Sequence, residues 1–337
     1  MQIPRKTGIG AALAALLIIL AFAGPAHALD VFLRAEVLTK TMHDGSVVPM
    51  WGFARDSAFG AMDGAVTVPG PAIVVPPGDG TLNIYLDNNL TAAATGFADG
   101  APVSIVIPSL KQALTPARAT VAPYEGRIRS FNYETAPGNA APVVYTWTGV
   151  TPGTHIYYSG AHPQITVQMG LYGAVTKNFA AGQPYQGVNA AKEVLVFYSE
   201  VDPLLHAAVA ANDYGAGKTV TSTMHYAPKY FLLNGNDAAS TASILAAGPE
   251  TILVRFVNAG NLYKCPNIQN VVMSEVAEAG FLKNYPETRW SMTLEPLMTR
   301  DALVTATAAG PIKLFDRRGY KSLMAADAAL ALTPTVN

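Results

Sequence analysis

The sequence predicts an all-β protein of two domains, and its composition and strand spacing support that fold class. Only 13% of the 337 residues are charged, whereas glycine (29) and proline (24) are plentiful. This composition suits a β-protein with many tight turns better than a helical protein. Short runs of β-forming residues recur at near-regular spacing, and no long helical period interrupts them. Such spacing is typical of one β-sandwich in each half of the chain.

Residues 1–28 have the pattern of a signal peptide. Arg5 and Lys6 form a positive start, Ala11–Ala23 is an apolar run of thirteen residues, and Ala26–Ala28 supplies a small-x-small cleavage site. The apolar run is shorter than the roughly 20 residues that a membrane-spanning helix needs. We therefore expect cleavage after Ala28, no membrane span afterwards, and an exported protein that is periplasmic, at the cell surface or extracellular. An uncleaved N-terminal anchor is the alternative.

The first predicted domain covers residues 29–178. A hairpin opens it, because Asp44-Gly45 lies between two apolar β-forming runs. Alternate residues from 82 to 86 are apolar, so they share one face of a strand. The strands predicted for this domain are 31–37, 47–53, 68–75, 80–88, 102–107, 143–147 and 155–158.

Residues 179–190 have the composition of a linker, and we place the domain boundary there. The second domain is predicted over 191–322, and a C-terminal tail over 323–337. Residues 202–211 are predicted to form a short helix, and the Ala- and Leu-rich run 322–332 a second one. The strands predicted for this domain are 193–199, 229–233, 251–257, 290–294 and 312–316.

Four stretches carry motifs in a fixed order. A Pro-Gly-Pro enters the β-runs that end in Asn-Asn-Leu (68–90), and a Gly-Thr strand closes with Gly-Leu-Tyr-Gly (153–175). A Pro-Lys-Tyr-Phe-Leu-Leu-Asn-Gly run (228–235) then precedes the strand 254–260. Together these motifs resemble the multicopper oxidase family. The resemblance implies two cupredoxin-like Greek-key β-sandwich domains in tandem, and it implies copper-dependent oxidoreductase chemistry.

The copper ligands of that family are largely replaced here. Its trinuclear copper cluster uses His-x-His pairs, because alternate strand residues put both imidazoles on one face. Val106 and Pro108 stand where the resemblance expects the first His-x-His pair of the first domain. Tyr158 and Gly160 stand where it expects the second pair. Neither an apolar nor a phenolic side chain offers copper a neutral imidazole nitrogen. We therefore expect no trinuclear cluster.

The family's mononuclear copper site needs a thiolate with two histidines and usually a methionine. Cys265 is the only cysteine, so no internal disulfide can form, and no histidine follows His225. The expected His-Cys-His arrangement is therefore absent. We interpret Cys265 as a small buried residue or a free thiol.

The remaining histidines leave one alternative metal site. His162 and His225 could hold copper weakly across domains or subunits, although a metal site needs about three or four ligands. His155 is interpreted as a satisfied or exposed side chain, and His43 and His206 as solvated ones.

Other polar and aromatic groups are interpreted structurally. Gln164 and Gln168 are four apart in an expected β-run, so both amides fall on one face and serve strand-end hydrogen bonds. Glu275, Glu278 and Asp301 are interpreted as solvated acids rather than a catalytic pair. Five tyrosines are expected in a sandwich core or an interface: Tyr133, Tyr145, Tyr157, Tyr158 and Tyr172.

Three function hypotheses follow. The formal net charge is −1 and no basic run interleaves with aromatic residues, so we expect no nucleic-acid partner. The preferred hypothesis is a multicopper-oxidase-like protein that has lost oxidase chemistry and acts as a binding, assembly or structural module. The second is a residual copper-binding protein or weak copper-dependent oxidoreductase. The third is a subunit of a surface layer or fibre that self-associates through β-sheet edges or aromatic faces.

Overall fold

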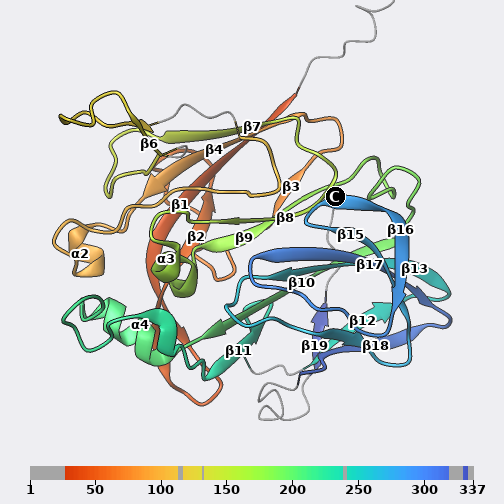
Figure 1. The fold of residues 1–337 in the computed structure, drawn as a ribbon. Coiled ribbons are helices and arrows are strands. Elements are labelled where there is room, and N and C mark those ends of the chain that lie inside the picture. Colours follow the sequence, from red (N-terminus) through yellow and green to blue (C-terminus); the bar gives the residue numbers. More distant parts are fainter. Residues whose placement is uncertain (1–26, 113–116, 131–132, 238–240, 319–328, 333–337) are drawn as a thin grey trace, which may run out of the picture.

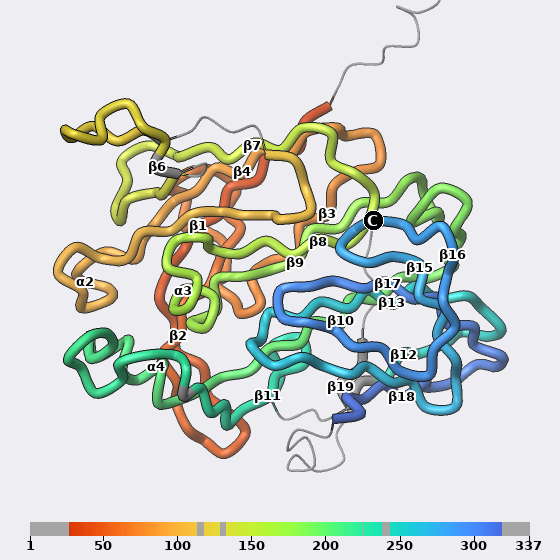
Figure 2. The backbone as a smooth tube through the Cα atoms, viewed as in Figure 1, coloured from red at the N-terminus to blue at the C-terminus, as the bar shows by residue number. Residues whose placement is uncertain are grey.

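Two groups of β-sheets, one from each half of the sequence, make up the protein (Figures 1 and 2). The structure is a computed structural model, and it describes residues 27–112, 117–130, 133–237, 241–318 and 329–332. The predicted signal peptide therefore lies outside the described residues up to position 26. Within the described part of the chain, no helix is long and apolar enough to cross a membrane.

The predicted opening hairpin is confirmed. Strands β1 (Ala28–Thr41) and β2 (Val47–Asp56) pair antiparallel down to Thr41↔Val47. The turn between them requires Gly45, whose φ of 81° is in the left-handed region.

Strand β1 also pairs parallel with β4 (Thr81–Asn88), and β4 pairs antiparallel with β7 (Val143–Thr148). The resulting sheet has the order β2-β1-β4-β7. The period-two prediction for β4 is confirmed, because Leu82, Ile84 and Leu86 are all completely buried.

The second sheet of the first half has the order β3-β9-β8. It consists of β3 (Ile73–Val75), β8 (Gly153–Tyr158) and β9 (Tyr172–Lys177), and a small pair, β5 (Ala117–Arg118) with β6 (Ile128–Ser130), lies apart. Residues 102–107 do not form the strand that the sequence predicts. They make only isolated bridges, Val103↔Thr135 and Val106↔Tyr158, because Pro102 and Pro108 at the two ends cannot donate ladder hydrogen bonds.

The second half contains a six-stranded sheet of the order β11-β10-β13-β17-β15-β16. A four-stranded sheet, β14-β18-β12-β19, faces the same core, which includes Val196, Phe256, Ile268 and Leu314. The strands are β10 (Lys192–Val201), β11 (Tyr230–Leu233), β12 (Thr241–Ala246), β13 (Glu250–Asn258), β14 (Pro266–Ile268), β15 (Met273–Glu278), β16 (Phe281–Arg289), β17 (Met298–Ala306), β18 (Gly310–Asp316) and β19 (Ala329–Leu332).

The two halves repeat one pairing pattern. Strand β1 pairs antiparallel with β2 and parallel with β4, and β10 in the same way pairs antiparallel with β11 and parallel with β13. In each half the parallel partner then pairs antiparallel with the next strand of the sheet. The prediction of an all-β chain with cupredoxin-like sandwiches is thus met by two main sheets in each half.

Short helices lie between the strands: α2 (Ala92–Thr95), α3 (Pro163–Met169), α4 (Pro203–Ala210) and the 3-10 turn Thr223–His225. The helix predicted over 202–211 is confirmed as α4, which begins where the Asp202 carboxylate accepts hydrogen bonds from two backbone amides. The tail helix is wrong for residues 329–332, which form β19, and residues 322–328 lie outside the described part.

An apolar core joins the two halves. Met50, Ile156 and Tyr172 from the first half pack with Phe197 and Val257 from the second. The Tyr172 and Phe197 rings are stacked with centroids 5.4 Å apart. The segment predicted as a linker also packs inward, because Tyr185 is buried against Leu253 and Ala277. Its composition suggested a spacer, but in the fold it lies against the second sandwich.

Candidate functional site

The two segments that carry the expected histidine positions lie side by side. The Val106 amide donates to the Tyr158 carbonyl at 2.9 Å, and the Tyr158 amide donates back at 3.1 Å. A Cβ atom on Gly160 would lie 2.5 Å from Cγ2 of Val106. Three of the four positions, on Val106, Tyr158 and Gly160, therefore meet in space, and Pro108 follows at an exposed position.

The side chains at this meeting point do not fit copper. Val106 and Gly160 have no donor atom, and burial raises the pKa of the half-buried Tyr158 phenol, which is therefore protonated at neutral pH. Copper sites in proteins are built from imidazole, thiolate and thioether groups. Among the residues that the structure describes, no cluster of three or more His, Cys, Asp and Glu side chains could hold a metal ion.

His162, the first predicted metal residue, lies at the start of α3. It has a left-handed φ of 45°, its side chain makes no cap hydrogen bond, and Pro163 occupies the first helical turn. The helix ends at Gly170, whose φ is 124° and whose added Cβ would lie 2.3 Å from the Trp51 carbonyl oxygen. Only glycine allows this close approach, so Gly170 fixes α3 against β2.

A pocket opens beside His162. Its cavity volume is about 280 Å³, and its walls come from Trp51 of β2, the segment from Phe97 to Pro102, and His162, Ile165 and Thr166 of the α3 region. The Trp51 and Phe97 rings meet edge-on with centroids 6.1 Å apart. Most of this lining is apolar. Its two exposed titratable groups are the His162 imidazole and the Asp99 carboxylate.

The prediction for Gln164 and Gln168 is wrong in its secondary structure. Both lie in α3 rather than in a β-run, and Gln164 is exposed whereas Gln168 is buried. The alternating apolar residues Ile165 and Val167 suggested a strand. Pro163 at the first helical position and Gly170 after the last one favour a helix instead.

His155 is buried at the contact between the two halves. Its Nδ1 atom lies 2.7 Å from Oγ of Ser109, and its Nε2 atom lies 3.1 Å from the Thr151 carbonyl oxygen. Gly280 of the β15–β16 turn covers the ring, because a Cβ there would lie 2.3 Å from Cε1. Burial lowers the pKa of His155 to about 4, with the Arg255 charge adding to the shift. His155 is thus a structural residue whose two ring nitrogens both have hydrogen-bond partners.

The other histidines do not join a metal-binding cluster either, as far as the described residues show. His206 is buried in α4, contrary to the expected solvation, and its Nδ1 lies 2.8 Å from the Pro49 carbonyl oxygen. Burial lowers its pKa. His43 is exposed and lies 2.8 Å from the Asp237 carboxylate. His225 ends the 3-10 turn, and its side chain lies outside the described part of the structure.

The interpretation of Asp301 as a solvated acid is wrong. Asp301 is 1% exposed, and its Oδ2 accepts hydrogen bonds from Thr154 at 2.8 Å and Tyr185 at 2.5 Å. The Arg255 guanidinium lies 3.2 Å away and also binds Glu193 at 2.7 Å. Burial raises the pKa of Asp301 despite the Arg255 charge. This buried network connects β8 of the first half to β13 and β17 of the second.

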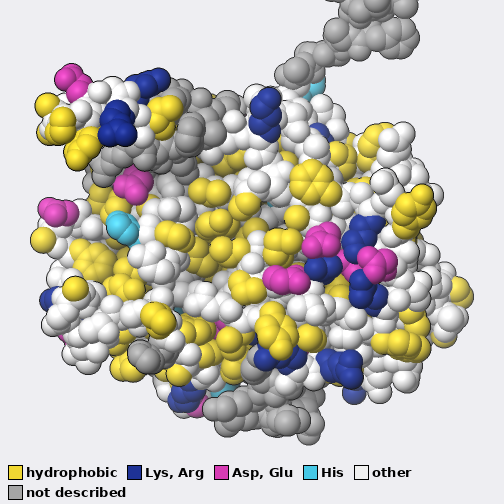
Figure 3. Space-filling view, viewed as in Figure 1, with side chains coloured by type: hydrophobic (Ala, Val, Ile, Leu, Met, Phe, Trp, Pro, Cys, Tyr) yellow, Lys and Arg dark blue, Asp and Glu magenta, His cyan; other side chains and the backbone are white. Residues whose placement is uncertain are grey.

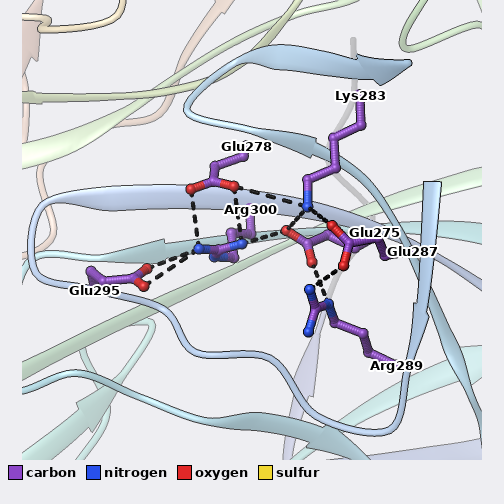
Figure 4. A network of polar contacts seen from close by, with 7 residues as sticks. All are labelled: Glu275, Glu278, Lys283, Glu287, Arg289, Glu295 and Arg300. Carbon is purple, nitrogen blue, oxygen red and sulfur yellow. Dashed lines mark hydrogen bonds and ion pairs between the residues drawn. The ribbon is translucent and has the colours of Figure 1, made fainter. Parts of the chain in front are cut away.

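The interpretation of Glu275 as solvated is also wrong, because it is buried in a network of ion pairs; Glu278 belongs to the same network but stays partly exposed (Figure 4). Glu275 is completely buried and faces three cations, namely Lys283 at 2.9 Å, Arg289 at 3.0 Å and Arg300 at 2.5 Å. Arg300 also binds Glu278 at 3.1 Å. The charged side chains of this network gather over β15 and β16 in Figure 3. Their mutual pairing explains how one carboxylate tolerates burial.

Sequence reasoning missed the pocket residues Trp51 and Phe97. Trp51 falls in the predicted strand 47–53, where an aromatic residue usually belongs to a core, and Phe97 falls in none of the predicted elements. No spacing rule could connect them, because Phe97 follows the short helix α2 and reaches Trp51 only in the folded chain.

Comparisons with known proteins place the fold. No protein-family model and no curated protein matches the chain. Among solved structures, the chain is similar to the multicopper oxidase mgLAC at 15% identity, TM-score 0.63, covering 91% of this chain and 86% of that one. It is similar to a blue copper oxidase from Nitrosomonas europaea at 14% identity, TM-score 0.63, covering 91% and 85%.

A copper nitrite reductase from Nitrosomonas europaea is likewise similar, at 19% identity and TM-score 0.60, covering 91% of this chain and 94% of that one. These likenesses extend over both halves of the chain and agree with the motifs at 68–90, 153–175, 228–235 and 254–260. The protein therefore has the tandem cupredoxin-like β-sandwich fold of the multicopper oxidases and related copper proteins.

Proposed function

We propose that this protein is an exported binding module that uses the cupredoxin-like scaffold without oxidase chemistry. The packing around Gly160 supports the proposal most directly. A Cβ at this position would lie 2.5 Å from the Val106 methyl group, so the space beside one expected ligand position is filled by an apolar side chain. A cupredoxin-like fold whose expected ligand position is packed with an apolar side chain is suited to holding a ligand or partner rather than to electron transfer.

The pocket beside His162 is the proposed binding site. Its volume of about 280 Å³ is close to the lower end of small-molecule sites, which span roughly 300–1,000 Å³. Trp51, Phe97 and Ile165 offer apolar and aromatic contact, while the exposed His162 imidazole can donate or accept one hydrogen bond. This combination favours a small aromatic ligand that carries one polar group.

The experiment uses phenol and indole as probes, with binding followed by calorimetry and by thermal shift. We expect saturable binding that weakens about threefold to tenfold in Phe97→Ala, because one aromatic contact contributes roughly 0.5–1.5 kcal/mol. Phe179→Ala is the matched control, since Phe179 is exposed and does not line the pocket. Absence of saturable binding, or equal affinity in Phe97→Ala and the wild type, would refute the proposed ligand site.

Self-association is the second candidate function, and the exposure of β16 favours it. This edge strand pairs only with β15 among the described strands, and it presents Phe281 (60% exposed) and Tyr285 (86%), followed by Trp290 (60%). Pro286 in the middle of the strand cannot donate a ladder hydrogen bond, so β16 is a poor site for strand addition. Contact between two copies would therefore use the aromatic side chains.

Sedimentation velocity over a range of concentrations tests this second function. We expect concentration-dependent association that is lost in the double variant Tyr285→Ser with Trp290→Ser. Met224→Ser is the control, because Met224 is 89% exposed on a different element. A monomer at every concentration would exclude self-association through this strand.

A further inference from the structure

A second cavity lies in the second half of the chain, near the ends of β16 and β18. Its volume is about 380 Å³, and three arginines line it, namely Arg289, Arg317 and Arg318. Ser291, Thr293 and the Cys265 thiol also face it. No carboxylate belongs to the lining, so the cavity is bounded by positive charge and hydroxyl groups.

Backbone contacts fix two of the arginines at this place. The Arg317 amide donates to the Cys265 carbonyl at 2.8 Å, which ties the end of β18 to the residue before β14. The amides of Cys265 and Arg318 both donate to Oδ1 of Asp316, at 2.9 and 3.0 Å. Asp316, the acidic residue next to Arg317, thus accepts hydrogen bonds from backbone amides.

The three guanidinium groups differ in their partners. Arg289 pairs with Glu275 at 3.0 Å and with Glu287. The Arg318 guanidinium lies 3.3 Å from the centre of the Tyr263 ring, a cation–π contact that orients its plane. The Arg317 side chain is exposed and has no hydrogen bond or ion pair to any residue that the structure describes.

The thiol does not offset this charge. Burial raises the pKa of Cys265, so the side chain is neutral at pH 7 and adds no negative charge to the cavity. Arginine forks match tetrahedral oxyanions because they offer several N–H donors in fixed geometry, and neighbouring hydroxyls can donate as well.

We propose that this cavity binds a tetrahedral oxyanion, of the phosphate or sulfate class, held by Arg317 and Arg318 with Ser291 and Thr293. Arg289 contributes positive charge at the rim while it remains paired with its carboxylates. The site lies on the second sandwich and is independent of the pocket beside His162.

Cys265 reports on occupancy, because it is the only cysteine and lines the cavity. The experiment measures alkylation of the full mature chain by neutral iodoacetamide at constant ionic strength. Inorganic phosphate or sulfate is expected to slow alkylation at least threefold, whereas chloride is not. Calorimetry with phosphate gives the affinity directly.

The Arg317→Gln variant is expected to bind phosphate at least about tenfold more weakly, because it loses a charge-assisted hydrogen bond to the anion. Arg317 has no side-chain partner among described residues, so its loss leaves the fold unchanged. Arg127→Gln is the matched control, since Arg127 is an exposed arginine that lies over Tyr124 in the first half. Equal slowing by phosphate and chloride, or unchanged phosphate affinity in Arg317→Gln, would overturn the proposal.

Discussion

At the scale of single residues, the packing between Gly160 and Val106 leaves no space for a larger side chain at position 160. Gly160 leaves room for the Val106 methyl group, and the backbone of Val106 hydrogen-bonds to Tyr158 in both directions. Any larger residue at position 160 would need Val106 to move. Restoring an imidazole there would therefore require at least two coupled substitutions.

The buried His155 ring predicts a specific dependence of stability on pH. Its pKa in the fold is about 4, against an ordinary pKa of 6.5 for histidine, so the unfolded chain binds the extra proton between these values. The stability that neutral His155 provides is complete above pH 6.5 and is lost as the pH falls toward 4. From pH 7 to pH 5 we expect about 2 kcal/mol of loss from this group.

Urea unfolding at pH 7 and pH 5 measures this effect, with His155→Asn as the comparison. The variant keeps a polar group near Ser109 but cannot titrate, so its stability should fall less between the two pH values. Equal losses in both proteins would show that His155 does not control this dependence.

Sequence reasoning singled out Val106 and Tyr158, which the structure places side by side, but it misjudged several polar residues. That histidines have been replaced at these positions stays a prediction. Glu275 and Asp301 were treated as solvated, because burial of a carboxylate depends on cations that come from other strands. No pattern within one strand reveals such a partner.

At the scale of elements, the β15–β16 turn joins the two sandwiches by close backbone approach. Gly280 (φ 79°) lies against the His155 ring. A Cβ on Gly153 would lie 2.8 Å from the Cα atom of Gly280. The turn can dock on β8 only because both positions lack a side chain.

The Gly280→Ala variant tests this docking against Gly45→Ala. Both glycines have a left-handed φ, so each alanine costs about 1–2 kcal/mol from backbone strain. An added Cβ meets nothing within 4 Å at Gly45 but lies 2.3 Å from the His155 ring at Gly280. We expect Gly280→Ala to be destabilised by a further 1–3 kcal/mol or so in urea unfolding. Equal losses of unfolding free energy in the two variants would contradict tight packing of this turn against His155.

Elements were predicted best where periodicity or turn chemistry is strong. The Asp44-Gly45 hairpin and the helix that follows Asp202 were found because their signals lie within a few residues. Helix α3 was missed, because a seven-residue helix with three β-branched residues, Ile165, Thr166 and Val167, resembles a strand. Its position depends on Gly170 packing against β2, which is a tertiary contact.

At the scale of the whole molecule, the Arg255 network connects the two sandwiches. Arg255 is completely buried and is held by Glu193, Asp301, Thr154 and Asn178, with Thr154 belonging to the first half. We expect Arg255→Met to cost about 3–5 kcal/mol in unfolding free energy, because two buried carboxylates lose their cation.

The double variant Arg255→Met with Asp301→Asn is the control. Removing one stranded carboxylate should recover part of the loss, as measured by urea unfolding. A loss below about 1 kcal/mol in the single variant would contradict a stabilising role for this network.

The tandem fold could be predicted from the sequence because strand spacing and motif order report on the chain as a whole. The joint core of Met50, Tyr172 and Phe197 could not, since it forms only when the two sandwiches meet. The cavity beside Cys265 was likewise invisible, because Arg289 and Arg317 are distant in sequence.

Copper content after reconstitution tests the central claim most directly. The purified protein is incubated with excess Cu(II) and then Cu(I), dialysed, and analysed by mass spectrometry together with its visible spectrum. A scaffold whose expected ligand positions hold Val106, Pro108, Tyr158 and Gly160 should retain less than one copper per chain and remain colourless. One or more tightly held coppers per chain, with the absorption of a copper–thiolate site or with phenol oxidation, would contradict the claim.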